Sequence, residues 1–87
     1  MALYYFHLRD GVDVLLDPEG RELDSGNIAE AALTEARAII SADARNGHVF
    51  LDQNIDVQDA SGAIVHCIAF EDAVQVTHSA VKSKRTG

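Results

Sequence analysis

Residues 3–16 read LYYFHLRDGVDVLL, and their pattern predicts an antiparallel β-hairpin at the start of the chain. Residues 3–9 alternate between two sets of side chains with a period of two, which is the spacing of a β-strand. Asp10-Gly11 is typical of a tight turn, and residues 12–16 alternate again as a returning strand. The next four residues, Asp17-Pro18-Glu19-Gly20, predict a turn, because proline presets the backbone angle at the second position.

Downstream of this hairpin, residues 28–45 form the only long helix that the pattern predicts. Asn27 is suited to cap its N-terminus together with Glu30, and Asn46-Gly47 is suited to end it in a left-handed turn. One stripe of the helix is apolar and rich in alanine, which allows a close approach to a sheet. This stripe consists of Ala29, Ala32, Leu33, Ala36, Ile39 and Ile40. Asp43 falls within the stripe, one turn beyond Ile39 and Ile40.

A second hairpin follows the helix, with strands over residues 55–57 and 63–70 and a turn at residues 59–62. Ile64, His66, Ile68 and Phe70 share one face of the last strand. The order is β-β-α-β-β, and one helix covers only one face of a sheet. We therefore expect a two-layer α+β fold, in which a four-stranded antiparallel sheet carries the helix on one face. Residues 1–76 form this single domain, and residues 77–87 are expected to be a flexible C-terminal tail.

The chain of 87 residues has a net charge of −7, so it repels the phosphate backbone of nucleic acids. Its basic run, residues 82–85, lies in the expected tail. The longest uncharged apolar stretch, residues 63–70, falls far short of the ~20 residues that cross a membrane. The N-terminus lacks the basic segment and cleavage site of a signal peptide, and the lone Cys67 excludes an internal disulfide. We expect a cytoplasmic protein with neither nucleic acid nor membrane as partner.

No motif predicts catalysis, a metal or a cofactor. A zinc site needs three or four converging ligands, and no two of the four histidines have the i, i+4 spacing of a helical pair. Cys67 and its neighbour His66 point to opposite faces of a strand, so they do not form a nucleophile and base pair. A glycine-rich phosphate loop is missing as well. We therefore expect no enzymatic activity.

Five motifs follow one another along residues 3–76. They are YYFHLRDG at residues 4–11, Glu22-Leu23, Asp43-x-Arg45-x-Gly47, Ile55-x-Val57-x-Asp59-x-x-Gly62 and Phe70-x-Asp72-Ala73-Val74. In this order they resemble a family of short bacterial domains of unknown function, common in soil-dwelling and plant-associated alphaproteobacteria. The resemblance implies a one-domain α+β fold, and it makes small aromatic plant metabolites of the flavonoid type plausible ligands. His66 departs from the family pattern, which usually has an aliphatic residue there.

Tyr5, His7 and Arg9 form a polar and aromatic row on the face of the first strand that is directed away from the helix. Tyrosine offers a flat apolar body, arginine stacks on aromatic rings and donates to phenolates, and histidine donates or accepts. We expect the row to bind a planar aromatic molecule such as a flavonoid, with His66 and Phe70 lining its apolar side.

Two other interpretations of the row stay open. It is an ordinary exposed row without a ligand, or it belongs to a protein-interaction or self-association module. A homodimer would be the simplest case of such a module, and the predicted architecture is similar to that of small antitoxin-type domains.

Asp43, Gly47 and Gly62 are expected to be structural residues. A carboxylate near a helix C-terminus opposes the helix dipole, and near the core it needs a partner. We expect Asp43 to accept hydrogen bonds from backbone N–H groups or from a basic side chain after the helix, with a role in ligand polarity as the alternative. Gly47 and Gly62 are expected to supply the turns after the helix and in the second hairpin.

Overall fold

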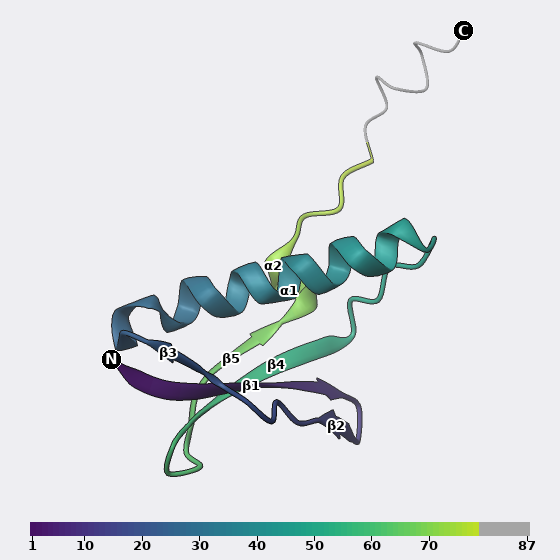
Figure 1. Ribbon diagram of the computed structural model, residues 1–87. Coiled ribbons are helices and arrows are strands. Elements are labelled where there is room, and N and C mark those ends of the chain that lie inside the picture. The colour runs from purple at the N-terminus through teal and green to yellow at the C-terminus, as the bar shows by residue number, and fades with distance from the viewer. Residues whose placement is uncertain (79–87) are drawn as a thin grey trace, which may run out of the picture.

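The computed structural model describes residues 1–78 and has an antiparallel sheet with one long helix across one of its faces (Figure 1). The strands are β1 (Ala2–Asp10), β2 (Asp13–Leu15), β3 (Arg21–Leu23), β4 (Gln53–Asp59) and β5 (Ile64–Ala69). The helices are η1 (Ser25–Asn27), a 3₁₀ turn, then α1 (Ile28–Arg45) and α2 (Phe70–Ala73). The predicted two-layer α+β class is confirmed. The tail predicted over residues 77–87, with its basic run, lies outside the described residues from residue 79 onward.

The sheet has five strands, one more than predicted, because two short strands share one side of β1. β2 pairs with the C-terminal end of β1 and β3 with its N-terminal end, while β4 lies on the other side of β1 and β5 beyond β4. Between β2 and β3, residues 16–20 leave the sheet, and Pro18 has no N–H to offer a strand ladder. The strand predicted over residues 12–16 is therefore shorter, and β3 was missed.

The register separates the side chains of the sheet into a helix side and an outer face, the face directed away from α1. On the helix side, Phe6 lies opposite Val57 and Leu8 lies opposite Ile55. On the outer face, Tyr5 lies opposite Gln58, His7 opposite Asp56 and Arg9 opposite Asn54. The predicted division of the first strand into two faces is thus present in the sheet.

A β-bulge changes the expected facing of the last strand. His66 pairs with Val57, but Ile64 pairs with Gln58, so Val65 has no partner opposite it in β4. One extra residue reverses the alternation of side chains beyond it. Ile64 therefore leaves the core face that the sequence predicted for it and is 60% exposed.

The helix α1 packs on β4, β5 and α2 through a narrow stripe of buried residues. The stripe consists of Ile28, Ala32, Ala36 and Ile40. Ala32 and Ala36 have no exposed surface, so their small side chains bring the helix close to the sheet as predicted. Ala29, in contrast, is exposed. Arg37 also donates from Nε to the carbonyl of Ala73 at 2.7 Å and so ties α1 to α2.

The ends of α1 differ in how well the sequence predicted them. The Asn27 side chain makes no capping hydrogen bond, because the 3₁₀ turn η1 leads into the helix instead. At the C-terminus, Gly47 has a φ of 86°, as predicted, and His48 donates its N–H to the carbonyl of Asp43 at 3.1 Å. The capping contribution of Asp43 thus comes from its backbone, and its carboxylate makes no hydrogen bond to any of the described residues.

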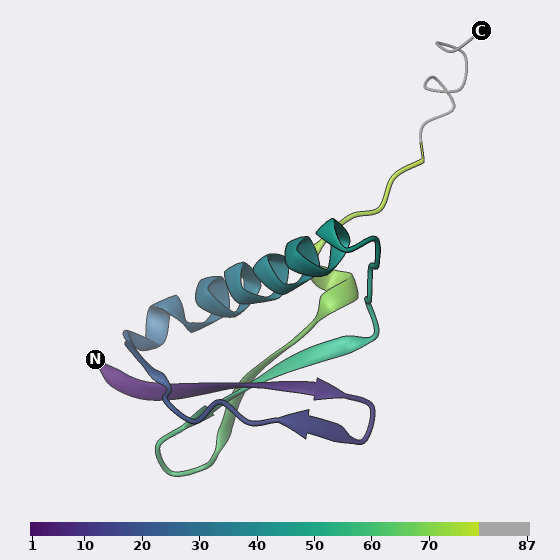
Figure 2. The same cartoon turned by 45° about the vertical axis from the view of Figure 1, so that its right-hand side comes forward.

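Because α1 lies mainly over β4 and β5, the helix side of β1 and β2 is left partly uncovered. Figure 2 shows the helix rising away from β1 and β2 toward its C-terminal end. A single helix of this length cannot cover all the strands of the sheet. In this uncovered corner between α1 and the first hairpin, the fold leaves Leu15 and Leu16 accessible.

Candidate functional site

On the outer face, Arg9 is held by a bidentate ion pair. Its Nε and Nη2 atoms donate to the two carboxylate oxygens of Asp56, at 2.7 and 3.1 Å. The hydrogen bond from Arg9 outweighs partial burial and keeps the pKa of the Asp56 carboxyl below its ordinary value. The same pair raises the pKa of the Arg9 guanidinium. The charged donor that the sequence offered to a ligand is therefore already paired within the sheet.

Cys67 completes this cluster. Arg9 Nη2 lies 3.6 Å from the Cys67 sulfur. A hydrogen bond to Asp56 and partial burial raise the pKa of the Cys67 thiol. Because the thiolate is the nucleophilic form, a thiol with a raised pKa is a poor nucleophile at neutral pH.

His7 is buried instead of lying in an open row, and only 8% of it is exposed. Its Nδ1 accepts the backbone N–H of Asp17 at 3.0 Å, which requires an unprotonated Nδ1 and leaves the ring proton on Nε2. Nε2 then donates to Oε1 of Gln58 at 3.3 Å. Both ring nitrogens are thus occupied. The expectation of a fully accessible row is corrected for His7, because the loop between β2 and β3 reaches it.

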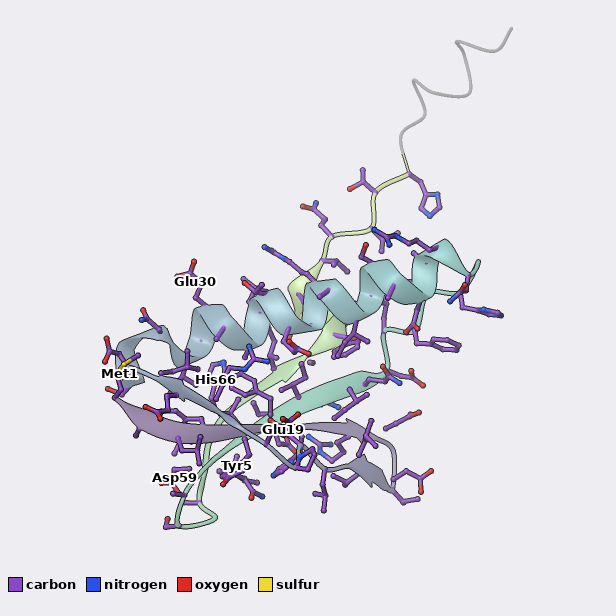
Figure 3. The ribbon with its side chains drawn as sticks, in the orientation of Figure 1. Met1, Tyr5, Glu19, Glu30, Asp59 and His66 are labelled. Atoms are coloured by element: carbon purple, nitrogen blue, oxygen red, sulfur yellow. The ribbon has the colours of Figure 1, made fainter. Side chains whose placement is uncertain are left out.

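Tyr5 is the member of the row that keeps accessible surface without a charged partner. Its ring stacks on His7, with the ring centroids 6.3 Å apart and the planes 12° from parallel. Among the described residues its hydroxyl makes no hydrogen bond to another side chain. Figure 3 shows Tyr5 on the side of the sheet away from α1.

Asp17 organises the loop that covers His7, and the sequence reading assigned it only to a turn. Its Oδ2 accepts the N–H of Phe6 at 3.1 Å, on the side of β1 away from β4 and in the gap between the segments that pair with β2 and β3. Its Oδ1 accepts the N–H groups of Glu19 and Gly20 at 3.2 and 3.1 Å. Partial burial acts to raise the pKa of this carboxyl, but the three N–H donors together hold it below its ordinary value. The Asp-x-x-Gly spacing predicts the local turn, whereas the bond to Phe6 follows from the pairing of strands.

On the helix side, an apolar groove of about 280 Å³ opens between α1 and the first hairpin. Its apolar walls are formed by Phe6, Leu8, Leu15, Leu16, Ile39 and Ile55. Leu15 and Leu16 are 70% and 65% exposed, which is unusual for two adjacent leucines beside a core. The sequence reading treated both leucines as ordinary strand residues.

The polar end of this groove is formed by Arg21 and Glu35. The guanidinium carbon of Arg21 lies 4.4 Å from the centroid of the Phe6 ring, which is a cation–π distance. Arg21 Nη2 also donates to Oε1 of Glu35 at 3.0 Å. The groove therefore combines aliphatic walls, an aromatic ring and an accessible ion pair.

Beside the groove lies a second, shallower hollow of about 370 Å³ that shares Arg21 with it. Its other lining residues are Asn27, Glu30, Ala31 and Thr34 at the start of α1. Four of these five lining residues, all except Ala31, carry polar or charged side chains. Arg21 thus lines both hollows.

The five residues predicted to bind a ligand do not converge on one place. Tyr5, His7 and Arg9 lie on the outer face, whereas His66 lies between the sheet and α1 (Figure 3). Phe70 has no exposed surface and belongs to the core. The predicted row therefore lies on the opposite side of the sheet from the two residues that were expected to line its apolar side.

Within residues 1–78, no group of three or more histidine, cysteine, aspartate or glutamate side chains is arranged to hold a metal ion. In the same part of the chain, the helices are too short or too polar to cross a membrane.

Comparison with family models matches residues 3–71 to a domain of unknown function, DUF6894. Neither a curated protein nor a solved structure matches the chain. The match covers the sheet, α1 and the start of α2, so it includes both the outer face and the groove.

Proposed function

The chain belongs to the DUF6894 family, a domain of unknown function, and we propose that it is a non-catalytic module that binds a small planar aromatic molecule in the groove between α1 and the first hairpin. The family assignment brings no activity with it. The proposal therefore rests on the geometry of the groove.

The observation that carries the proposal is the pair Leu15 and Leu16, which form one wall of the groove while remaining mostly exposed. A ligand that covers them gains the hydrophobic free energy that the fold itself leaves unused, about 25 cal/mol for each Å² removed from water. Ligand pockets usually enclose about 300–1,000 Å³, so a groove of about 280 Å³ suits a small ligand of one to three rings.

The polar end of the groove supports an aromatic ligand that carries hydroxyl groups. A ligand ring placed beside Phe6 would enlarge the aromatic surface that the Arg21 guanidinium already contacts. A phenolic hydroxyl would donate to the carboxylate of Glu35 or accept from Arg21. Flavonoids combine these features, and the resemblance to domains of plant-associated alphaproteobacteria supports that class. The lone Cys67, which has no disulfide partner, supports a reducing, cytoplasmic setting for the module.

A binding role is favoured over catalysis because the reactive side chains are engaged elsewhere. Both nitrogens of His7 are hydrogen-bonded, and the pKa of the Cys67 thiol is raised. Neither side chain reaches the groove, which lies on the other side of the sheet. Among the ionisable residues that line the groove, Arg21 and Glu35 neutralise each other as an ion pair, and the carboxylate of Asp17 already accepts three backbone N–H groups.

The proposal is tested by titrating the ¹⁵N-labelled protein with quercetin and, separately, with 2-naphthol. Amide signals of Leu8, Leu15 and Ile39 are expected to move, with affinity in the micromolar range. Leu16→Glu, at an exposed position, should weaken binding by about tenfold or more, since it places a charge in the apolar wall. Val12→Glu is the matched control, because Val12 is 97% exposed on the same hairpin and does not line the groove.

Arg9→Ala adds a second control on the outer face and should leave binding unchanged. Chemical-shift changes confined to residues 5–9 and 64–67 would indicate that the ligand binds on the outer face and not in the groove. If no amide moves with either compound, the small-molecule proposal fails.

The alternative is a protein-interaction module, antitoxin-like or regulatory, and one observation favours it. Four exposed apolar residues, Val12, Val14, Leu15 and Leu16, follow closely along the edge hairpin. A continuous apolar edge of this kind is also typical of protein contacts. In that case the titration shows no shift with either compound, while Leu16→Glu and Val12→Glu both weaken the protein contact.

A further inference from the structure

Part of the groove wall is a loop, residues 16–20, that lies between β2 and β3 and belongs to no strand. Three residues of this loop line the groove: Leu16, Asp17 and Pro18. The two ends of the loop are fixed, because β2 pairs with β1 before it and β3 pairs with β1 after it. The position of this wall therefore depends on what holds the middle of the loop.

Asp17 holds the middle of the loop against β1 with two hydrogen bonds. Its carboxylate Oδ2 accepts the N–H of Phe6 at 3.1 Å, and its own N–H donates to Nδ1 of His7 at 3.0 Å. The hydrogen bonds that Glu19 and Gly20 donate to the Asp17 carboxylate stay within the loop. One of the two bonds between the loop and β1 thus depends on the protonation state of an imidazole ring.

The hydrogen bond between Asp17 and His7 exists only while the His7 ring is neutral. The N–H of Asp17 needs the lone pair of Nδ1, and in an imidazolium both ring nitrogens carry protons and only donate. Turning the ring over does not restore an acceptor, because it brings the second N–H group into the place of the first. Only 8% of His7 is exposed, so bulk water does not separate the two donors. Protonation therefore breaks the contact between Asp17 and β1 at this point.

The neighbours of His7 keep their charge in mild acid. The titratable and charged residues near its ring are Tyr5 and Arg9 on β1, Asp17 and Glu19 in the loop, Asp56 on β4 and Cys67 on β5. Asp56 lies opposite His7, but its carboxylate is paired with Arg9. The pKa values of the Asp17 and Asp56 carboxyls lie below their ordinary value of 3.8, and the pKa of the Cys67 thiol is raised from 9.0. Histidine, in contrast, is the side chain that ordinarily changes its charge between about pH 8 and 5.

We infer that protonation of His7 opens one wall of the groove: the neutral ring holds residues 16–20 against β1, and the charged ring releases them. The bond from Phe6 to the Asp17 carboxylate remains in mild acid, so the loop is loosened and not detached. Leu16 and Pro18 then no longer have a fixed place in the wall. The effect on a ligand rests on the proposed function, whereas the movement of the loop does not require a ligand.

The first measurement follows the unliganded full chain by NMR between about pH 8 and 5. At the upper end, long-range ¹H–¹⁵N spectra should show an unprotonated Nδ1 and a protonated Nε2 in His7. On acidification, the amide signals of Leu16 and Asp17 should shift with the same midpoint as the His7 ring. The amide of Gly62, in the turn between β4 and β5, is the internal reference and should not follow that midpoint.

The second measurement is the affinity for 2-naphthol, a phenol that stays uncharged at both of the pH values used, about pH 7.5 and 5.5. The dissociation constant should rise about threefold to tenfold in acid, which is the effect of one lost hydrogen bond. In His7→Asn, Oδ1 is bonded to Cγ as Nδ1 is in histidine and accepts at both pH values, so the dissociation constant should not change with pH. His7→Phe offers no acceptor and should bind weakly at both. The other three histidines remain in both variants and control for titration elsewhere.

Two results without ligand would overturn the inference: an Nδ1 of His7 that carries a proton at pH 8, or an Asp17 amide that does not follow the titration of the ring. With ligand, equal affinity of the wild type at both pH values would overturn it while the proposed function stands. An acid effect that persists in His7→Asn would also overturn it, because another group then causes the effect. If 2-naphthol binds at neither pH, the proposed function fails, and the amides of Leu16 and Asp17 still decide whether His7 holds the loop.

Discussion

Replacing Asp17 with alanine tests whether one carboxylate substitutes for the missing strand beside the middle of β1. In the folded chain this side chain accepts the N–H groups of Phe6, Glu19 and Gly20. Phe6 is buried, so its N–H loses its partner in the variant, whereas those of Glu19 and Gly20 lie in the loop and gain water. A hydrogen bond to a charged acceptor stabilises by about 1.5–3 kcal/mol, so we expect a loss of about 2–3 kcal/mol in the free energy of unfolding.

The measurement is urea unfolding followed by circular dichroism at neutral pH, with Asp13→Ala as the matched control. Asp13 lies on the same edge, is exposed and makes no side-chain hydrogen bond within the described residues, so its removal should change stability by less than about 0.5 kcal/mol. Domains of this size are stable by only about 5–10 kcal/mol, so the Asp17 variant should unfold at a clearly lower urea concentration.

The pH dependence provides an independent check. The pKa of the Asp17 carboxyl in the folded chain lies below its ordinary value of 3.8. The stabilisation is therefore fully present above that value and is lost as the pH falls through the lower, folded pKa. The difference between wild type and Asp17→Ala should shrink below about pH 4. A variant that is as stable as wild type at neutral pH, or a difference that grows in acid, would refute the role of Asp17.

Two further substitutions test the helix. Ala36→Phe should lower the free energy of unfolding by about 1–3 kcal/mol, because Ala36 has no exposed surface and a larger side chain forces α1 away from the sheet. The measurement is urea unfolding, and an unchanged urea midpoint would mean that α1 does not pack closely on the sheet at this position. Asp43→Ala should leave stability within about 0.5 kcal/mol or raise it slightly, because its backbone makes the cap and its carboxylate opposes the helix dipole. If thermal unfolding shows that the variant loses more than about 1 kcal/mol of stability, the Asp43 side chain stabilises the fold as the sequence predicted.

Local patterns predicted those features that depend on neighbouring residues. The period of two in residues 3–9 identified β1, and the spacing of Ala32, Ala36 and Ile40 identified the buried stripe of α1. Gly47 and Gly62 have φ values of 86° and 90°, as their turns require. In each case the preference of a few residues along the chain is sufficient, because the interactions span only a few positions.

Features that depend on distant parts of the chain were missed or misplaced. β3 has only three residues, too few for a periodic signal, and it forms because β1 has a free side there. The bulge at Val65 is a property of the pairing between β4 and β5, and it turned Ile64 outward.

The sequence alone was sufficient for the division of β1 into two faces, the single α1 helix and the α+β class, because periodicity records which side chains share a side of their own element. It did not reveal what covers each side. His7 became buried because the loop around Asp17 reaches it from the neighbouring strands, and Leu15 and Leu16 became exposed because α1 lies over β4 and β5 instead of β2. Periodicity carries no information about where another element lies, and that placement moved the candidate site from the outer face to the groove.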